Sequence, residues 1–516
     1  MAFDPAHSDV LRALSQRLVT RDALLCAVAE QQHTIAQKSD VIAAQQQRIA
    51  LLEEQLRLLR AQRFGRSSEK SEDQLELFET AEIPTQAPQP PPDDDRKQRR
   101  RGRKGFSKSI PRQPIYLHLS DSEKAGALDT FFVKVKEELD ITPAKVCVLE
   151  FWQEKAVFVD QGQRRLVQAQ RPHHPLGKAT VSVNLLAYLI VAKYCDALPL
   201  YRLEGMLKRY GGSVSRSTLA QWLIRLSLQL QPLINLLRDE QLSGDYLQGD
   251  ETRIKVLKEP GLKASSHKWM WIMRGGPPDR PIVLFDYDRS RGKVVAQRLL
   301  ESFEGDYFQS DGYAGYDGVC QRKGIVHLGC WDHVRRKFVA AEKAQPLHKI
   351  NTTTSKASEA LSTMRVLYRI EREIKERSVD EKRQQRQLHS LPVLNDFKHW
   401  LEVNAPKVVK GGLTREAMDY ALSQWPKLVR YCDHGQLNIS NILAENAIRP
   451  FAVGRKAWLF ADTPAGAKAS AVYFSLVETA EANDLEPYQY LCKVIERMPY
   501  AETVEQWEAL LPWNIK

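Results

Sequence analysis

Residues 246–257 read YLQGDETRIKVL, and this stretch decides how the chain is interpreted because the strand predicted there contains an aspartate, Asp250. Apolar patterns after it predict four more strands. These are expected at residues 268–273, 281–287, 307–310 and 325–328. An amphipathic helix is predicted over residues 293–303, and another through residues 335–338. The central part of the chain is therefore predicted to be a mixed α/β domain.

The order of these elements can bring two aspartates together. Three strands, a helix, a fourth strand and then a fifth strand with its helix match the order of a ribonuclease-H-like core. In such a sheet the first and fourth strands are neighbours, so Asp250 can converge with Asp311 at the end of the fourth strand. Phosphoryl transfer can use such carboxylates to hold two Mg²⁺ ions about 3.5–4 Å apart, with Mn²⁺ as a substitute. Magnesium keeps several waters, so two or three carboxylates suffice.

A third carboxylate is expected from a helix packed beside the first strand, and Glu445 is the candidate. It lies in residues 441–450, NILAENAIRP, where apolar residues recur at helical spacing and Pro450 should end the helix. The predicted catalytic and metal-binding residues are thus Asp250, Asp311 and Glu445. Spacing alone leaves other acidic trios open.

Basic residues near the predicted acidic site suit a surface that grips the DNA backbone. They are Arg335, Arg336, Lys337, Arg449, Arg455 and Lys456. Residues 458–460, WLF, follow and could provide stacking platforms for bases. Packing in the core explains Trp458 equally well.

The chain has 516 residues, which is too long for one compact core, so several domains are expected. Asp311 and Glu445 are far apart in sequence, and the helical patterns at residues 361–374 and 391–403 predict a helical insertion between them. The expected division has eight segments. They are a coiled-coil helix (1–62), a linker with a basic arm (63–110), a small β-containing domain (111–175), a helical helix-turn-helix-like region (176–243), the first part of the ribonuclease-H-like core (244–345), the helical insertion (346–435), the second part of the core (436–484) and a helical tail (485–516).

The first segment has apolar residues at every seventh position, namely Val28, Ile35, Ile42, Ile49 and Leu56. A seven-residue repeat places one seam along a helix and favours supercoiling with a partner helix. We therefore expect a homo-oligomer joined by a coiled coil. A single amphipathic helix packed on its own chain is the alternative.

A cationic block follows a proline-rich linker within residues 80–110. Its basic residues are Arg96, Lys97, Arg99, Arg100, Arg101, Arg103 and Lys104. The formal net charge of the chain is +11, which favours a polyanionic partner because binding releases counterions from phosphates. The block is therefore predicted to be an arm that lies along DNA, although a solvated charge run would have the same composition.

Short strands are expected at residues 145–151 and 156–159, and helices from 184 to 240. Within residues 200–226, a glycine pair separates one predicted helix from a second that starts at a capping serine. This pattern is typical of a helix-turn-helix, with Arg216 near the start of the second helix, where base edges are usually contacted. Ordinary helical packing would give the same pattern.

The sequence contains no run of about 18 apolar residues and does not begin with a secretion signal, so a cytoplasmic protein with no membrane partner is expected. Its seven cysteines lie far apart, which argues against disulfides. Cys330 and His333 have the spacing of a metal-binding pair, but without further partners packing explains His333 better.

Several motifs together resemble the large transposase of the insertion sequence 66 family from about residue 20 to the C-terminus. They are RFGRSSEK (63–70) with residues 74–78, KY (193–194) with LPLYR (198–202), DET (250–252) with VL (256–257), DGY (311–313) with GY (315–316), CW (330–331) with His333 and RRKF (335–338), AE (444–445) with AIRP (447–450), and GRK (454–456).

The resemblance implies a DDE transposase with an N-terminal leucine zipper, a zinc-binding segment and a catalytic domain interrupted by an insertion. It assigns metal binding to Asp250, Asp311 and Glu445. The implied reaction nicks the ends of the element, and the freed 3′-hydroxyl then attacks target DNA. The implied partners are the element ends, the target DNA and small accessory proteins of the same element.

The chain departs from the family pattern in two places. Family members usually have paired cysteines between about residues 125 and 160, whereas this chain has Cys147 alone, so no structural zinc is expected. The family pattern around the third carboxylate is Asp-Asn-Asn-x-Ala-Glu-Arg, whereas residues 440–446 read SNILAEN. Losing an acid, an amide and an arginine there would weaken support of the carboxylate. A catalytically decayed transposase that only binds DNA is therefore the alternative function.

Overall fold

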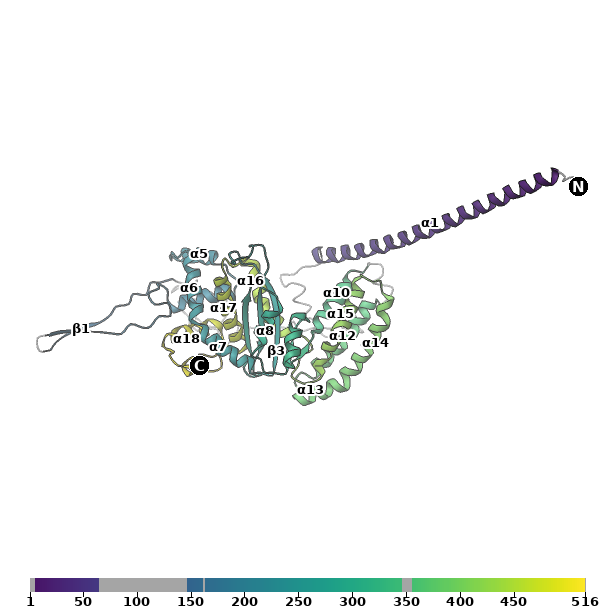
Figure 1. Cartoon of the computed structure of the whole chain (residues 1–516). Helices are drawn as coiled ribbons and strands as arrows, with labels where there is room; N and C mark the ends of the chain where they lie inside the picture. The colour runs from purple at the N-terminus through teal and green to yellow at the C-terminus, as the bar shows by residue number, and fades with distance from the viewer. Residues whose placement is uncertain (1–4, 65–145, 161–162, 346–354, 516) are drawn as a thin grey trace, which may run out of the picture. The chain divides into compact units, whose positions relative to one another are not determined.

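The computed structural model describes residues 5–64, 146–160, 163–345 and 355–515 (Figure 1). Most of these residues are helical, and a mixed sheet lies among the helices. The elements before the sheet are α1 (Pro5–Phe64), β1 (Lys155–Asp160), β2 (Gln163–Gln168), α4 (Val183–Tyr194), α5 (Leu200–Arg209), α6 (Arg216–Gln229) and α7 (Gln231–Leu242).

Next along the chain come the strands of the sheet, with helices between them, and then a series of helices up to the C-terminus. The sheet region contains β3 (Tyr246–Ile254), β4 (Lys268–Gly275), β5 (Ile282–Asp288), α8 (Lys293–Leu300), β6 (Tyr307–Gln309), α9 (Asp317–Lys323), β7 (Val326–Leu328) and α10 (Trp331–Lys343). After it come α12 (Lys356–Glu373), α13 (Val379–Gln385), α14 (Leu391–Asn404), α15 (Leu413–Leu428), α16 (Ile442–Trp458), α17 (Pro464–Ala482), α18 (Pro487–Arg497) and α19 (Val504–Glu508).

The five-stranded sheet has the order β5-β4-β3-β6-β7. β3 runs antiparallel to β4 and parallel to β6, and the last residues paired between β3 and β6 are Gln248 and Gln309. β5 is antiparallel to β4, and β7 is parallel to β6. Parallel neighbours end at the same edge of a sheet, so the residues that follow Gln248 and Gln309 lie next to each other.

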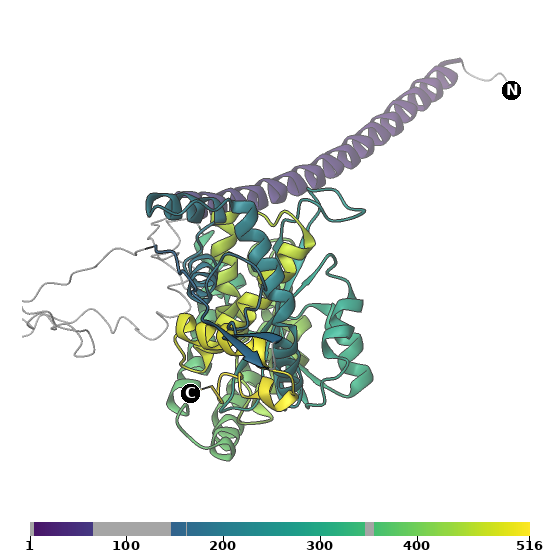
Figure 2. The same ribbon diagram turned by 90° about the vertical axis from the view of Figure 1, so that its left-hand side faces the viewer.

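Both faces of the sheet are buried, and alternate residues of β4 show this. Met270 and Ile272 belong to one apolar cluster, whereas Trp271 and Met273 belong to another, because successive strand residues point to opposite faces. Helix α17 covers the first face, where the ring of Phe474 lies 5.4 Å from that of Phe285. Figure 2 shows the yellow C-terminal helices on this side, among the blue helices of residues 183–242.

Helices α10, α12, α14 and α15 share a separate apolar core beside the sheet. Its centre is aromatic: the ring of Trp331 lies 6.2 Å from Phe397 and 5.7 Å from Trp425. The helices expected near residues 361–374 and 391–403 are therefore confirmed as elements, in α12 and α14.

The strand expected at residues 145–151 is wrong for its described part, because residues 146–154 have no regular secondary structure. Val148 and Phe151 are 86% and 80% exposed, so the apolar pattern there does not reflect burial in a sheet. The strand expected at residues 156–159 is confirmed as β1, which pairs with β2.

The prediction that Pro450 ends its helix is also wrong, since α16 continues through it to Trp458. Proline removes one backbone donor from a helix interior, which disfavours the helix there. Ile448, Phe451 and Gly454 are buried on one side of α16, and their packing outweighs that loss.

Helix α1 is confirmed as a long helix, and its apolar seam faces solvent. Ile35, Ile42 and Ile49 are 66%, 54% and 56% exposed. The coiled coil itself stays a prediction. Among the described residues, no helix is both long enough and apolar enough to cross a membrane.

The second helix of the predicted helix-turn-helix begins as expected. Ser215 caps α6 by accepting a hydrogen bond from the backbone N–H of Thr218. Gly211, in the preceding turn, has a φ of 89°, a conformation that glycine adopts without strain. Arg216, at the start of α6, is exposed.

Glu478 on α17 is a buried carboxyl whose pKa is raised to about 8, mainly by burial and then by Glu481, against a smaller opposing effect of Arg274. The unfolded carboxyl ionises near pH 4.5, whereas the folded one stays neutral up to about pH 8. Its contribution to stability is therefore complete below pH 4.5 and falls as the pH rises to 8, by at most about 1.4 kcal/mol per pH unit.

We expect Glu478→Gln to flatten this fall, so that the variant gains stability over the native chain between pH 5 and 8. Urea denaturation midpoints at pH 5, 6.5 and 8 measure the difference. Glu496→Gln, which changes an exposed carboxyl, is the matched control. If the urea midpoints of Glu478→Gln and the native chain changed equally with pH, the prediction would be contradicted.

Candidate active site

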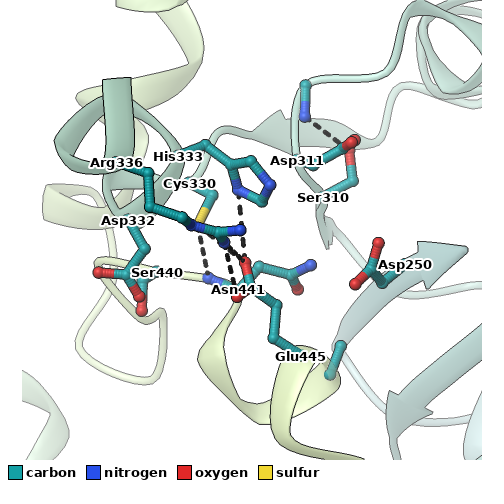
Figure 3. Close-up of polar contacts among 12 residues, drawn as sticks. Asp250, Ser310, Asp311, Cys330, Asp332, His333, Arg336, Ser440, Asn441 and Glu445 are labelled. Atoms are coloured by element: carbon teal, nitrogen blue, oxygen red, sulfur yellow. Dashed lines mark hydrogen bonds and ion pairs between the residues drawn. The ribbon is translucent and has the colours of Figure 1, made fainter. Parts of the chain in front are cut away.

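Asp250 and Asp311 lie at matching positions of two neighbouring parallel strands. Each follows by two residues the last pair of the β3–β6 register, Gln248 and Gln309. Adjacent strands are about 4.8 Å apart, and positions two residues apart share a face. Figure 3 shows Asp250, Asp311 and Glu445 around one common space, with Glu445 coming from α16.

Asp250 sits in a crowded, low-dielectric position. Burial raises its pKa well above the usual range, and the carboxylates of Glu251, Glu445 and Asp311 raise it further. Its Oδ1 accepts a hydrogen bond of 2.8 Å from the backbone N–H of Glu251, which opposes the shift only in part. Like charges gathered in this way favour a cation, which is the electrostatic requirement of a metal site.

Gly249 lets β3 and β6 approach each other beside Asp250. A Cβ at this glycine would lie 2.7 Å from Cζ of Phe308, which is fully buried on β6. A side chain at position 249 would therefore require the buried ring of Phe308 to move, beside the two strands that hold the aspartates.

Two buried glutamines connect these strands to the segment that bears Glu445. The Gln248 amide donates to Oε1 of Gln309 at 2.8 Å, and its Oε1 accepts from the backbone N–H of Ala444 at 3.2 Å. The Gln309 amide donates to the carbonyl oxygens of Gly329 and Asn438. The first turn of α16 is thus fixed against both aspartate-bearing strands.

Asn441, immediately before α16, adds a direct connection to β3. It is fully buried, and its amide donates to the carbonyl oxygen of Gly249 at 3.0 Å. Asn441 and Asn446, on either side of Glu445, each have a buried Oδ1 without a hydrogen-bond partner. The side chains that flank Glu445 are therefore only partly satisfied.

The side chain of Asp311 is 23% exposed. Its Oδ1 accepts from the backbone N–H of Tyr313 at 2.9 Å, and its Oδ2 lies 3.8 Å from Nη2 of Arg291. Gly312 follows with a φ of 90°, so the chain turns sharply after the aspartate.

Glu445 is held by Arg336 of α10, whose Nη2 lies 2.6 and 2.7 Å from the two carboxyl oxygens. Nδ1 of His333 lies 3.4 Å from Oε1 but makes no hydrogen bond. Burial raises the pKa of Glu445 above its usual value, although Arg336 opposes the shift. Burial and Arg336 lower the pKa of His333 to about 4, so this imidazole is neutral near pH 7.

The carboxylate oxygens of Asp250, Asp311 and Glu445 are hard donors, and this donor set fits Mg²⁺. Cys330, His333 and Glu445 also form a group whose ligand atoms lie within 4.8 Å of one another. Such groups are common in proteins that bind no metal there, so this one does not by itself indicate zinc.

Comparisons with known proteins identify the family of this chain. A family model described as "Transposase IS66 family" matches residues 178–469, which include all three carboxylates. The chain belongs to the IS66 family of transposases. Two further models of this family match, an "IS66 C-terminal element" over residues 475–513 and a "Transposase C of IS166 homeodomain" over residues 51–115. Family membership implies DNA as the partner.

Similar proteins occur in Sinorhizobium fredii. "Uncharacterized protein y4qI" is 29% identical over 549 residues, covering 99% of this chain and 97% of that protein. "Uncharacterized protein y4jD" is also 29% identical, covering 81% of this chain and 84% of that protein.

The cations predicted from the sequence of this IS66-family chain have different surroundings. Arg455 donates to Oγ1 of Thr252 at 2.7 Å and to the carbonyl oxygen of Arg253, so it lies against β3. Lys337 lies over the ring of Tyr420, with 4.8 Å from Nζ to the ring centroid. Lys456 is exposed, whereas Arg335 and Arg449 are partly buried. The basic arm at residues 96–104 lies outside the described residues.

The surroundings of Trp458 favour core packing over base stacking. Its ring lies 5.6 Å from that of buried Phe451, and the side chain packs on the main core. Phe460, at 42% exposed, is the more accessible aromatic.

Sequence reasoning missed Arg291 and Glu251, which lie beside the aspartates. The Glu251 side chain is 1% exposed, and its Oε1 accepts from Nε of Arg291 at 2.8 Å. Arg291 also lies over the rings of Trp269 and Tyr313, at 5.0 and 4.2 Å. Neither spacing nor a motif in residues 289–292 points to Arg291. Glu251 was visible only as the neighbour of Asp250 in the DET motif.

Proposed function

We propose that this chain is a DNA transposase that nicks the ends of its insertion sequence and joins the freed 3′-hydroxyl to target DNA. One observation supports this most directly: Asp250 and Asp311 occupy matching positions of paired strands, and Glu445 faces the same space from α16. The burial and mutual repulsion of these carboxylates explain why they would hold divalent cations.

In this proposal the three carboxylates are the metal ligands. Two Mg²⁺ ions bound there would activate the attacking oxygen and stabilise the leaving one. The chain itself supplies fixed geometry, because Gln248, Gln309 and Asn441 hold the ligand-bearing segments together. Arg291 and Arg455, which lie beside β3, are suited to hold DNA phosphates near the carboxylates.

We propose a ribonuclease-H-like core for this catalytic region. The strand order β5-β4-β3-β6-β7, with three antiparallel strands followed by two parallel ones, supports this. Residues 346–435 would then be its helical insertion, and the other segment boundaries expected from the sequence are proposed with it. The exposed seam of α1 supports a homo-oligomeric coiled coil. The arm at residues 96–104 and Arg216 would add DNA contacts, and the protein would act in the cytoplasm.

Cleavage assays test the function directly. Purified full-length protein with Mg²⁺ should nick duplex DNA that carries the terminal repeats flanking its gene, and EDTA should stop the reaction. Mn²⁺ should restore it after chelation. A duplex with scrambled ends is the matched control. Metal-independent nicking, or equal nicking of both duplexes, would contradict the proposal.

A decayed transposase that only binds DNA is the second candidate. The unsatisfied Asn446 amide oxygen and the ion pair between Arg336 and Glu445 favour it, because both weaken the case for Glu445 as a metal ligand. Binding of the correct ends without any Mg²⁺- or Mn²⁺-dependent nicking would select this function.

A further inference from the structure

The carboxylate of Glu445 is already neutralised by a cation of the chain itself. A single nitrogen of Arg336, Nη2, contacts both carboxyl oxygens at 2.6 and 2.7 Å. Hydrogen bonds between two charged groups are among the strongest in proteins. A divalent ion that uses either oxygen of Glu445 must therefore compete with this guanidinium.

The two partners of this ion pair differ in exposure. The Glu445 side chain is 11% exposed, whereas that of Arg336 is 46% exposed. Arg336 can therefore turn its charge into water, while the carboxylate stays in place. The first turn of α16 is also fixed, since Ala444 donates its backbone N–H to Gln248. A divalent ion would accordingly replace the guanidinium at Glu445 by movement of Arg336, with the carboxylate staying in place.

Arg336 does not engage the carboxylates of Asp250 and Asp311 in this way. Arg291 lies 3.8 Å from Asp311, and Arg291 forms its shorter bonds with Glu251. Asp250 and Asp311 thus offer oxygens under weaker competition than Glu445. This asymmetry predicts two unequal metal-binding events, the weaker one requiring Glu445.

We propose that Arg336 is a positioning residue that competes with the divalent ion for Glu445 and so sets the affinity of the weaker metal-binding event. This rests on the proposed function, in which Glu445 is a metal ligand. Arg336, which the sequence suggested as a DNA contact, acts in this proposal through Glu445.

Mn²⁺ binding to the full-length protein without DNA tests the proposal, with free Mn²⁺ measured by electron paramagnetic resonance. Arg336→Gln should tighten the weaker binding event about tenfold, because removing a competing cation frees the carboxylate. Arg335→Gln removes an equal charge from the same helix and is the matched control, with a change of less than about twofold. Arg336→Lys keeps the charge without the guanidinium and should give an intermediate affinity.

A double-variant cycle assigns the effect to Glu445. Glu445→Gln should lower the Mn²⁺ affinity of the weaker binding event. Adding Arg336→Gln to Glu445→Gln should not raise that affinity again. Unchanged or weaker Mn²⁺ binding in Arg336→Gln, with Arg336→Lys behaving like the native chain, would overturn the proposal. Structural damage cannot imitate the expected result, because damage lowers metal affinity. Circular dichroism spectra confirm that each variant is folded.

The outcomes for Arg336 and for the proposed function are distinguishable. If Glu445→Gln and Asp250→Asn bind Mn²⁺ like the native chain, the metal site itself is refuted. If both weaken binding while Arg336→Gln gives no tightening, only the competition by Arg336 is refuted.

Discussion

Asp250→Asn should abolish Mg²⁺-dependent nicking, with a loss of about 10³-fold or more, because an amide cannot replace a carboxylate that holds catalytic cations. The same variant should bind DNA ends at least as tightly as the native chain in EDTA, since the change removes no basic side chain from the DNA-facing surface. Gel-based nicking assays and filter binding measure the two properties. Residual nicking above about a tenth of the native rate would contradict the assignment.

Asp250→Asn should also stabilise the metal-free protein, by about 1 kcal/mol. Burial and the nearby carboxylates raise the pKa of Asp250 above its unfolded value, so its charge reduces stability once the pH exceeds that unfolded value. An amide removes this repulsion. A thermal melt at pH 7.5 in EDTA would show the gain, and a lower melting temperature would count against it.

Asp317→Asn is the control for the thermal melt of Asp250→Asn, because it should change stability in the opposite direction. His327 and Lys427 lower the pKa of Asp317 to about 2, so its charge contributes stability above the unfolded value, and this contribution is lost as the pH falls toward 2. The asparagine variant should therefore be less stable at pH 7.5. If Asp250→Asn and Asp317→Asn both raised, or both lowered, the melting temperature, the opposite electrostatic surroundings of the two aspartates would not explain the changes.

Arg386→Met should cause the largest loss of stability, about 3–5 kcal/mol, because it leaves a poorly exposed charge without its partner. Arg386 is 3% exposed in the π-helical turn η3 (Arg386–Ser390), and its Nε and Nη2 donate to the carboxyl oxygens of Glu371 at 2.9 and 2.6 Å. Its Nη1 also donates to the carbonyl oxygens of Tyr431 and His434. One guanidinium thus joins α12 to the segment that leads toward α16.

Chemical denaturation monitored by tryptophan fluorescence measures this loss. Arg369→Met is the matched control, because Arg369 and Glu373 form an exposed pair at 3.9 Å on the same helix as Glu371, and its removal should cost less than about 0.5 kcal/mol. Adding Glu371→Leu to Arg386→Met should recover part of the stability, since no charge then remains unpaired. Equal losses for Arg386→Met and Arg369→Met would refute the structural role of the Arg386 pair.

The sequence predicted the strands of the sheet well because each carries a local signal. β4 and β5 run mostly apolar, and the structure places them close to the expected positions. β3 also lies close to its expected position, although its apolar residues stand only at its two ends. The pattern failed at residues 146–151, where exposed apolar residues imitate a strand, and at Pro450, where packing overrides a local helix-breaking signal.

The candidate site also contains some residues that the sequence could predict and some contacts that it could not. Asp250, Asp311 and Glu445 could be nominated from motif and element order, although their metal-binding role stays a proposal. The contact between Arg336 and Glu445 could not be predicted, because these residues are 109 positions apart and separated by the helical segment. The network of Gln248 and Gln309 was hidden too, since a buried glutamine has no periodicity of its own.

The sequence by itself determined the order of strands and helices, the acidic residues that end or follow them, and the membership of the chain in its family. Only the tertiary structure decided which cations lie against Glu445 and Asp311 and which amides hold α16 against the sheet. The physical reason is that periodicity records whether a side chain is buried, whereas the identity of its partner depends on how distant segments pack.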